Sequence, residues 1–126
     1  MPPAELNELK SIPGLAERLA ASGTARQFSE GEVILDENMR IRAIPFVRKG
    51  SVRVIRRDED GRELLLYNIR SGESCIMSLL GGLHNETSKV VAVAEEPTEV
   101  VFLPIDQMTA LIRENPDLLN YIFRLY

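Results

Sequence analysis

The residues best suited to chemistry lie close together in one stretch, which we call the 72–89 segment. It holds the single cysteine, Cys75, and the single histidine, His84, of this 126-residue chain. Cys75 lies at the start of a short helix predicted over residues 74–80, where the helix dipole favours a thiolate, so redox or electrophile sensing is one interpretation. Because free cysteine is among the most buried residue types, we favour a buried, inert thiol.

His84 lies in a polar loop over Gly81–Glu86. Its chemistry would suit haem ligation or a pH switch, but no second ligand is evident, so a solvated loop histidine is the favoured interpretation. One cysteine and one histidine make a poor inventory of metal ligands, and an iron–sulfur cluster needs several cysteines. We find no Ser-His-Asp order, no recognisable carboxylate pair and no glycine-rich phosphate loop. We therefore expect no catalytic residue, no metal and no certain cofactor, and thus no enzyme.

An anion is the other chemistry that this segment could serve. Gly72 precedes the predicted helix, and the free N–H groups at a helix start suit an anion. Lys89 would add a positive charge, with hydroxyl or amide partners from Asn85, Thr87 and Ser88; the alternative is that Lys89 is a solvated strand residue. The candidate ligand-binding residues are Gly72, Glu73, Ser74, Cys75, Ile76, Met77, Thr87, Ser88 and Lys89, and the effector would be an unknown small molecule or anion.

Composition and charge narrow the class of protein. A hydrophobic fraction of 44% and a charged fraction of 27% are typical of a globular protein. The net charge of −4 argues against a general nucleic-acid binder. Residues 40–57 nevertheless carry seven basic side chains and no acidic one, which leaves the rest with 8 basic and 19 acidic residues. This basic stripe could dock an anionic partner, but solvated outward positions are favoured; its members are Arg40, Arg42, Arg48, Lys49, Arg53, Arg56 and Arg57.

The elements that must position these residues are predicted to form one domain, residues 1–126. Helical spacing over Ala4–Ala21, interrupted at Pro13–Gly14, predicts two short helices in residues 1–26, with Gly23 as the C′ residue. Short β-rich segments fill residues 27–104 at intervals that predict a sandwich or barrel, and Asp58–Gly61 predicts a hairpin. Residues 105–126 read as closing helices, the first with Asp106 as N-cap and a stop at Asn115.

The second closing helix, from about Asp117, is apolar up to the last residue, so we expect the chain to be cut from a longer protein. No apolar run reaches the roughly 20 residues that span a bilayer, and no secretory signal is visible, so we expect no membrane partner and a cytoplasmic location.

Five segments resemble, in order, the cyclic nucleotide-binding domain. They are FSEGEVI (28–34), FVRKGSVRV (46–54), DEDGREL (58–64), SGES (71–74) and the AEEPTEV stretch (94–100) with its following FLP. Together they identify the chain as similar to the sensor half of the CRP/FNR transcription regulators. The resemblance implies a mainly β fold with flanking helices, a double-stranded β-helix of the jelly-roll or β-roll kind.

The same resemblance implies an effector-sensing domain and a long helix that dimerises and relays the signal to a DNA-binding helix-turn-helix, which this chain lacks. The full-length protein is then expected to form a homodimer and to contact DNA only through the missing part. The implied dimerisation residues are Leu118, Leu119, Ile122, Phe123, Leu125 and Tyr126.

The chain departs from the family where cyclic nucleotides bind. The family's Gly-Glu, which takes the ribose, falls on Ile76 and Met77, and its Arg-Ser, which takes the phosphate, falls on Ser88–Lys89. Lysine offers a point charge where arginine offers a bidentate fork. We therefore expect no tight cyclic AMP binding. The alternatives are a ligand-free structural or interaction module, or a regulatory domain of another signalling protein such as an enzyme or channel.

Overall fold

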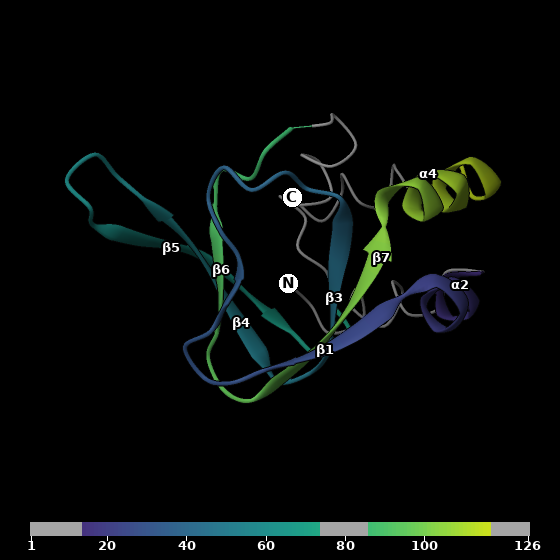
Figure 1. The fold of residues 1–126 in the computed structure, drawn as a ribbon, viewed down its shortest axis with the longest axis horizontal. Coiled ribbons are helices and arrows are strands. Elements are labelled where there is room, and N and C mark those ends of the chain that lie inside the picture. Colours follow the sequence, from purple (N-terminus) through teal and green to yellow (C-terminus); the bar gives the residue numbers. More distant parts are fainter. Residues whose placement is uncertain (1–13, 74–85, 117–126) are drawn as a thin grey trace.

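The computed structural model of the chain describes residues 14–73 and 86–116. Two helices flank seven strands in this part of the chain (Figure 1). In order, the elements are α2 (Leu15–Ser22), β1 (Thr24–Phe28), β2 (Val33–Leu35), β3 (Ala43–Lys49), β4 (Ser51–Arg57), β5 (Glu63–Arg70), β6 (Val91–Ala94), β7 (Thr98–Pro104) and α4 (Ile105–Glu114). The predicted arrangement, mainly β with flanking helices, is confirmed.

The strands form two antiparallel sheets, in the orders β1-β7-β3 and β2-β6-β4-β5. Figure 1 shows α2 and α4 beside the three-stranded sheet, whereas the β4–β5 hairpin projects on the opposite side of the molecule. Strands that are distant in sequence pair with one another, as β1 does with β7 (Thr24 opposite Phe102). This is the jelly-roll arrangement that the sequence predicted.

Apolar side chains from both sheets fill the space between them. Alternate residues of a strand point to the same face, so Val52 and Val54 of β4 enter the interior together with Ala92 and Ala94 of β6. We call this cluster the roll interior. Its buried members are Phe28, Ile34, Leu35, Val47, Val52, Val54, Ile69, Val90, Ala92, Ala94 and Val100.

A second core joins the helices to the three-stranded sheet. Ile44, Leu103 and Leu111 are fully buried there, next to Met108 and Leu15. The guanidinium of Arg18 in α2 donates to Gln107 Oε1 of α4 at 2.8 Å and pairs with the Glu114 carboxylate. The two helices are therefore fixed to one another as well as to the sheet.

Glycines at the turns serve different purposes. Gly50, between β3 and β4, has φ 96°, and a Cβ there would lie 2.4 Å from Thr98 Oγ1. Helix α2 ends where predicted, but Gly23 is its C-cap rather than its C′ residue, and the Gly23 backbone is extended (φ −80°). Glycine suits position 23 because a Cβ would meet the Leu19 carbonyl oxygen at 2.4 Å and Val101 Cγ1 at 2.6 Å. The predicted C′ role is therefore wrong, and close packing takes its place.

The closing helix also begins differently from the prediction. α4 starts at Ile105 after Pro104, with no side-chain cap, and Asp106 lies in its first turn. The predicted N-cap role of Asp106 is therefore wrong, although its carboxylate does accept the Gln107 N–H at 3.0 Å. The predicted stop at Asn115 is confirmed, since Asn115 is the C-cap. The helices predicted before Pro13, over residues 74–80 and after Asp117 lie outside the described residues.

The β4–β5 turn follows the prediction closely. The Asp58 carboxylate accepts the backbone N–H of Asp60 at 3.0 Å and of Arg62 at 2.8 Å. Gly61 has φ 81°, a left-handed conformation that a glycine adopts without strain. In the described part of the chain, neither helix has the length and apolar character needed to cross a membrane.

Candidate ligand-binding site

The beginning of the 72–89 segment is fastened to strand β3. The Gly72 N–H donates to the Val47 carbonyl at 2.7 Å, and the Val47 N–H donates to the Glu73 carbonyl at 3.0 Å. Ser71 Oγ donates to the Arg48 carbonyl at 2.7 Å. Gly72 has φ 90°, a conformation that glycine adopts without strain, so the chain can turn sharply after β5. These backbone bonds fix where the segment leaves the sheet.

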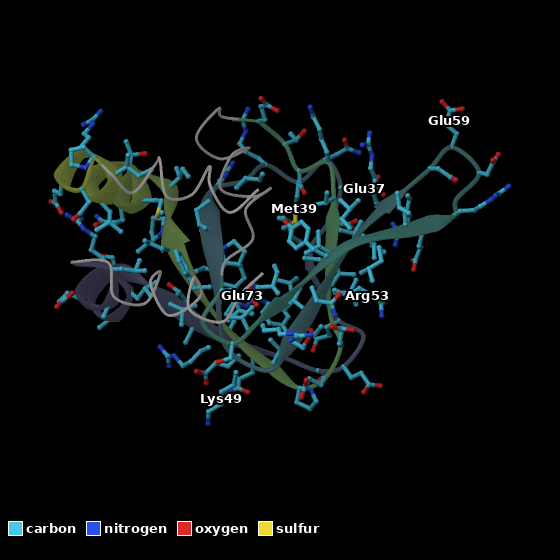
Figure 2. The ribbon with its side chains drawn as sticks, turned by 180° about the vertical axis from the view of Figure 1, so that it is seen from behind. Glu37, Met39, Lys49, Arg53, Glu59 and Glu73 are labelled. Atoms are coloured by element: carbon cyan, nitrogen blue, oxygen red, sulfur yellow. The ribbon has the colours of Figure 1, made fainter. Side chains whose placement is uncertain are left out.

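Glu73 was predicted to contact a ligand, and its carboxylate is engaged locally. Oε1 accepts the Arg70 N–H at 2.8 Å, while the Glu73 N–H donates to the Arg70 carbonyl at 2.9 Å. The side chain thus closes the turn at the end of β5. Figure 2 shows Glu73 well away from Met39, the residue that marks the other attachment of the segment.

The return of the segment is held by the loop between β2 and β3. The Ser88 N–H donates to the Met39 carbonyl at 2.8 Å, and the Asn38 N–H donates to the Ser88 carbonyl at 2.8 Å. Thr87 forms an isolated β-bridge with Arg40. This partnership was not predicted, because Arg40 and Thr87 are far apart in the sequence and no local motif links them.

Ser88 stands where the nucleotide-binding pattern has its arginine, and it is buried. Its hydroxyl donates to the Val90 carbonyl at 2.7 Å and accepts the Val90 N–H at 3.2 Å. The hydroxyl therefore donates one hydrogen bond to the backbone of this chain and accepts another from it. Within the described residues, no buried side-chain nitrogen or oxygen lacks a partner.

Lys89 points to solvent. Its side chain is 71% exposed, and Nζ lies 3.7 Å from Glu86 Oε2. A pair this exposed contributes little to stability. The orientation corresponds to the alternative in which Lys89 is a solvated residue next to a strand.

The roll interior offers apolar surface and no charge. Across residues 14–73 and 86–116, the buried polar side chains are Ser88 and Thr98. Thr98 donates to the Glu96 carbonyl at 2.7 Å and accepts the Ser51 N–H at 3.3 Å, so it too is satisfied. Burying a phosphate next to such a surface would cost several kcal/mol for want of a charged partner. The described part of the roll interior is therefore apolar.

The remaining predicted positions lie outside the described residues. They are Ser74, Cys75, Ile76 and Met77 of the candidate ligand set, His84 and Asn85, and the dimerisation residues Leu118, Leu119, Ile122, Phe123, Leu125 and Tyr126. Where the chain is described, no three His, Cys, Asp or Glu side chains gather in a way that could hold a metal ion.

The basic stripe of residues 40–57 does not converge on one patch. Arg42 and Lys49 flank the two ends of β3, which are roughly 20 Å apart at the rise of a strand. Arg48 pairs with Glu99 at 2.9 Å, and Arg57 pairs with Glu37 at 3.3 Å. Figure 2 shows Lys49 and Arg53 on different parts of the surface. Six of the seven side chains are exposed, as expected for solvated outward positions.

Known proteins share this architecture. The family model of the cyclic nucleotide-binding domain matches residues 25–115. No curated protein matches the chain. Among solved structures, the catabolite activator protein of Thermus thermophilus is 27% identical with a TM-score of 0.71, and the match covers 99% of this chain and 53% of that protein.

Two further structures share the fold at lower identity. The c-di-GMP responsive global regulator CLP of Xanthomonas campestris is 22% identical with a TM-score of 0.75, and the match covers 89% of this chain and 56% of CLP. The sensor domain of the transcriptional regulator DNR of Pseudomonas aeruginosa is 18% identical with a TM-score of 0.76, covering 96% and 80%. The chain thus spans about half the length of the first two regulators. These three structural neighbours are regulators of the CRP/FNR group.

Proposed function

The chain belongs to the cyclic nucleotide-binding domain family, and from that premise we propose that it is the effector-sensing and dimerisation domain of a bacterial CRP/FNR-like transcription regulator. The observation that carries this proposal is the family match over residues 25–115, on a β-roll that spans about half of a full regulator. The family is regulatory and ligand-binding. The chain would act in the cytoplasm by binding, without catalysis, and would reach DNA through a part that lies beyond it.

The effector would not be cyclic AMP bound in the usual way. Ser88 replaces the arginine, and its hydroxyl is engaged with Val90. The neighbouring Lys89 points to solvent. Together with the uncharged roll interior, this favours a small effector with apolar surface over a cyclic phosphate.

Dimerisation is the second part of the proposal. Leu64, Leu65 and Leu66 of β5 are 62%, 54% and 38% exposed, in direct succession. Such a run of exposed apolar side chains is typical of an interaction surface. We infer that the full-length homodimer covers it, together with the apolar residues Leu118, Leu119, Ile122, Phe123, Leu125 and Tyr126.

Signalling would then be a shift between two populations of the dimer. An effector changes DNA binding only as far as it binds one arrangement more tightly than the other. The two attachments of the 72–89 segment, at Val47 and at Met39, connect the effector site to strand β3 and to the loop between β2 and β3. A change in the segment would thereby be transmitted to the closing helices.

The first experiment is a calorimetric titration of the chain with cyclic AMP and with cyclic GMP. We expect no heat and no shift in melting temperature from either nucleotide. Binding at micromolar Kd or better (about −8 kcal/mol) would contradict the proposal that the effector is not a cyclic nucleotide, because another residue would then have replaced the arginine. The variant Lys89→Ala separates the two cases, since it would weaken such binding only if Lys89 were that replacement.

A ligand-free interaction module remains the second candidate, favoured because every buried polar side chain within residues 14–73 and 86–116 has a hydrogen-bond partner. Screening small carboxylates, aromatic acids and nucleotides by melting temperature distinguishes it from a sensor, because a module without an effector shows no stabilisation. The reading frame beyond Tyr126 separates both from a third candidate. A helix-turn-helix supports the regulator, and a catalytic or membrane domain supports another signalling protein.

A further inference from the structure

Met39 is an apolar residue that the fold leaves in contact with solvent. The residue is 50% exposed, whereas Met108, the other methionine in the described part of the chain, is 2% exposed. Met108 belongs to the core under the helices, and Met39 lies in the loop between β2 and β3. The two methionines therefore differ in their access to a dissolved oxidant, which is what converts methionine to its sulfoxide.

The sulfur of Met39 closes a turn that directly follows β2. Sδ accepts the Asp36 N–H at 3.4 Å, and the Met39 N–H donates to the Asp36 carbonyl at 3.3 Å. Asn38 lies between them with φ 64°, a left-handed conformation that asparagine adopts more readily than most residues. Figure 2 shows Met39 and its sulfur near Glu37 of the same turn. The side chain and the backbone of Met39 thus hold the same residue, Asp36.

The same turn holds the return of the 72–89 segment. The Asn38 N–H donates to the Ser88 carbonyl, and the Ser88 N–H donates to the Met39 carbonyl, each at 2.8 Å. The hydrogen bonds that close the turn and those that attach the segment therefore share the backbone of residues 38 and 39. Because Ser88 is buried, its N–H depends on this partner rather than on water. A change in the shape of the turn thus changes the attachment of Ser88.

We propose that Met39 is a modification site, at which hydrogen peroxide oxidises the thioether to a sulfoxide. The sulfur lone pair attacks one peroxide oxygen, and the S–O bond forms as the O–O bond breaks. The hydrogen of the transferred oxygen passes to the departing hydroxide, which leaves as water. The sulfur is oxidised by two electrons, and the peroxide is reduced by two. Methionine sulfoxide reductases reverse this modification, so the site can act as a switch.

Oxidation removes the acceptor that closes the turn. The sulfur of a sulfoxide carries a partial positive charge, so it no longer accepts an N–H, and the new oxygen needs room of its own. The Asp36 N–H then bonds to that oxygen or to water, and either change alters the spacing between Asp36 and Met39. The Met39 carbonyl shifts with its residue, and its hold on Ser88 weakens. Oxidation thus loosens the return of the segment and leaves its other attachment, at Val47, in place.

Peptide mass spectrometry tests the site. The folded chain is treated with hydrogen peroxide, and the gain of one oxygen is followed over time in the peptides that contain Met39 and Met108. We expect Met39 to be oxidised several-fold faster than Met108, because burial keeps the oxidant from Met108. The same comparison in urea is the control, since the two rates should converge once the chain is unfolded.

Amide exchange tests the effect on the attachment. After peroxide treatment, exchange at the Ser88 and Asn38 amides should be several-fold faster than before, because both donate hydrogen bonds across this attachment. The Val47 amide, which holds the other end of the segment, should be unchanged. The matched control is Met39→Leu, which keeps the apolar bulk and cannot be oxidised at position 39. It retains every other oxidisable residue of the chain, so its Ser88 exchange should not respond to peroxide.

Three results would overturn the inference. Oxidation of Met39 no faster than that of Met108 in the folded chain would remove the modification site. Unchanged Ser88 exchange in a chain whose Met39 is oxidised would show that the sulfur does not control the attachment. An equal response in Met39→Leu would assign the effect to another residue. None of these measurements involves an effector, so the inference stands or fails separately from the proposed function.

Discussion

The two sheets of the roll differ in how their outer faces are protected. The sheet β1-β7-β3 packs its outer face against α2 and α4 through a cluster of seven buried residues that includes Ile44, Leu103 and Leu111. The outer face of β2-β6-β4-β5 carries a cluster of three buried residues, Ile55, Val91 and Val93. Both sheets share the roll interior, so the difference lies outside it.

The helix-covered face mainly stabilises the fold, whereas the other outer face is the better candidate for interaction with a partner. A face under two helices excludes water over a wide area, so its seven-residue cluster contributes more to the free energy of folding than the three-residue cluster of the other outer face. The cluster around Ile55 is adjacent to the exposed leucines of the β4–β5 hairpin, because Ile55 is opposite Leu65. Leucines exposed in this way either contact a partner or contribute little to the stability of the domain.

The largest expected effect compares the two outer clusters directly. Leu103→Ala removes a fully buried side chain under the helices and should lower the free energy of unfolding by about 3–5 kcal/mol. Ile55→Ala, in the small cluster, should cost about 2–3 kcal/mol, since fewer neighbours surround the cavity. Urea denaturation of both variants measures the difference. Equal losses would mean that the two outer faces are equally important for stability.

A smaller effect is expected where the two sheets connect. Gly50→Ala forces a left-handed alanine, which costs about 1–2 kcal/mol, and its Cβ also collides with Thr98 Oγ1 and the Pro97 carbonyl oxygen. Gly31→Ala is the matched control, because Gly31 has φ 86° but no atom within 4 Å of its Cβ. Thermal melting should show Gly50→Ala to be the less stable of the two. If the two variants melt together, the contact with Thr98 carries no energetic weight.

The smallest effect on stability is expected at the hairpin. Leu64→Ser/Leu66→Ser should change the free energy of unfolding of the monomer by no more than about 0.5 kcal/mol for each exposed position. The same variant should weaken self-association of the full-length protein, measured by sedimentation velocity, because it removes apolar contact area. A loss of stability without a change in self-association would place these leucines in the fold rather than at an interface.

Much of the fold could be predicted from local patterns. The alternation of Val52 and Val54, the Asp58–Gly61 turn and the stop at Asn115 each depend on a few neighbouring residues, and each is confirmed. Where the prediction failed, at Gly23 and Asp106, the outcome depended on contacts across the fold or on the residue that starts the helix. Gly23 is close to Val101, which no pattern around position 23 contains.

The candidate site could be predicted only in outline. The positions of Gly72 and Ser88 in the segment follow from the sequence, and so does the absence of an arginine at position 88. Their partners do not, because Val47 and Met39 lie on other elements. An apolar pocket beside α2 is lined by residues 15, 16, 19, 46–48, 71, 72 and 101, so no single window of the sequence contains it.

By itself, the sequence determined the alternation of strands and turns, the apolar interior and the types of residue available for binding. These depend on local backbone preference and on hydrophobic periodicity. The tertiary structure alone decided where the 72–89 segment attaches: the Gly72 N–H bonds to the Val47 carbonyl, and the Ser88 N–H bonds to the Met39 carbonyl. The physical reason is that hydrogen bonding and burial depend on which strands meet, and that is set by long-range packing of the whole chain.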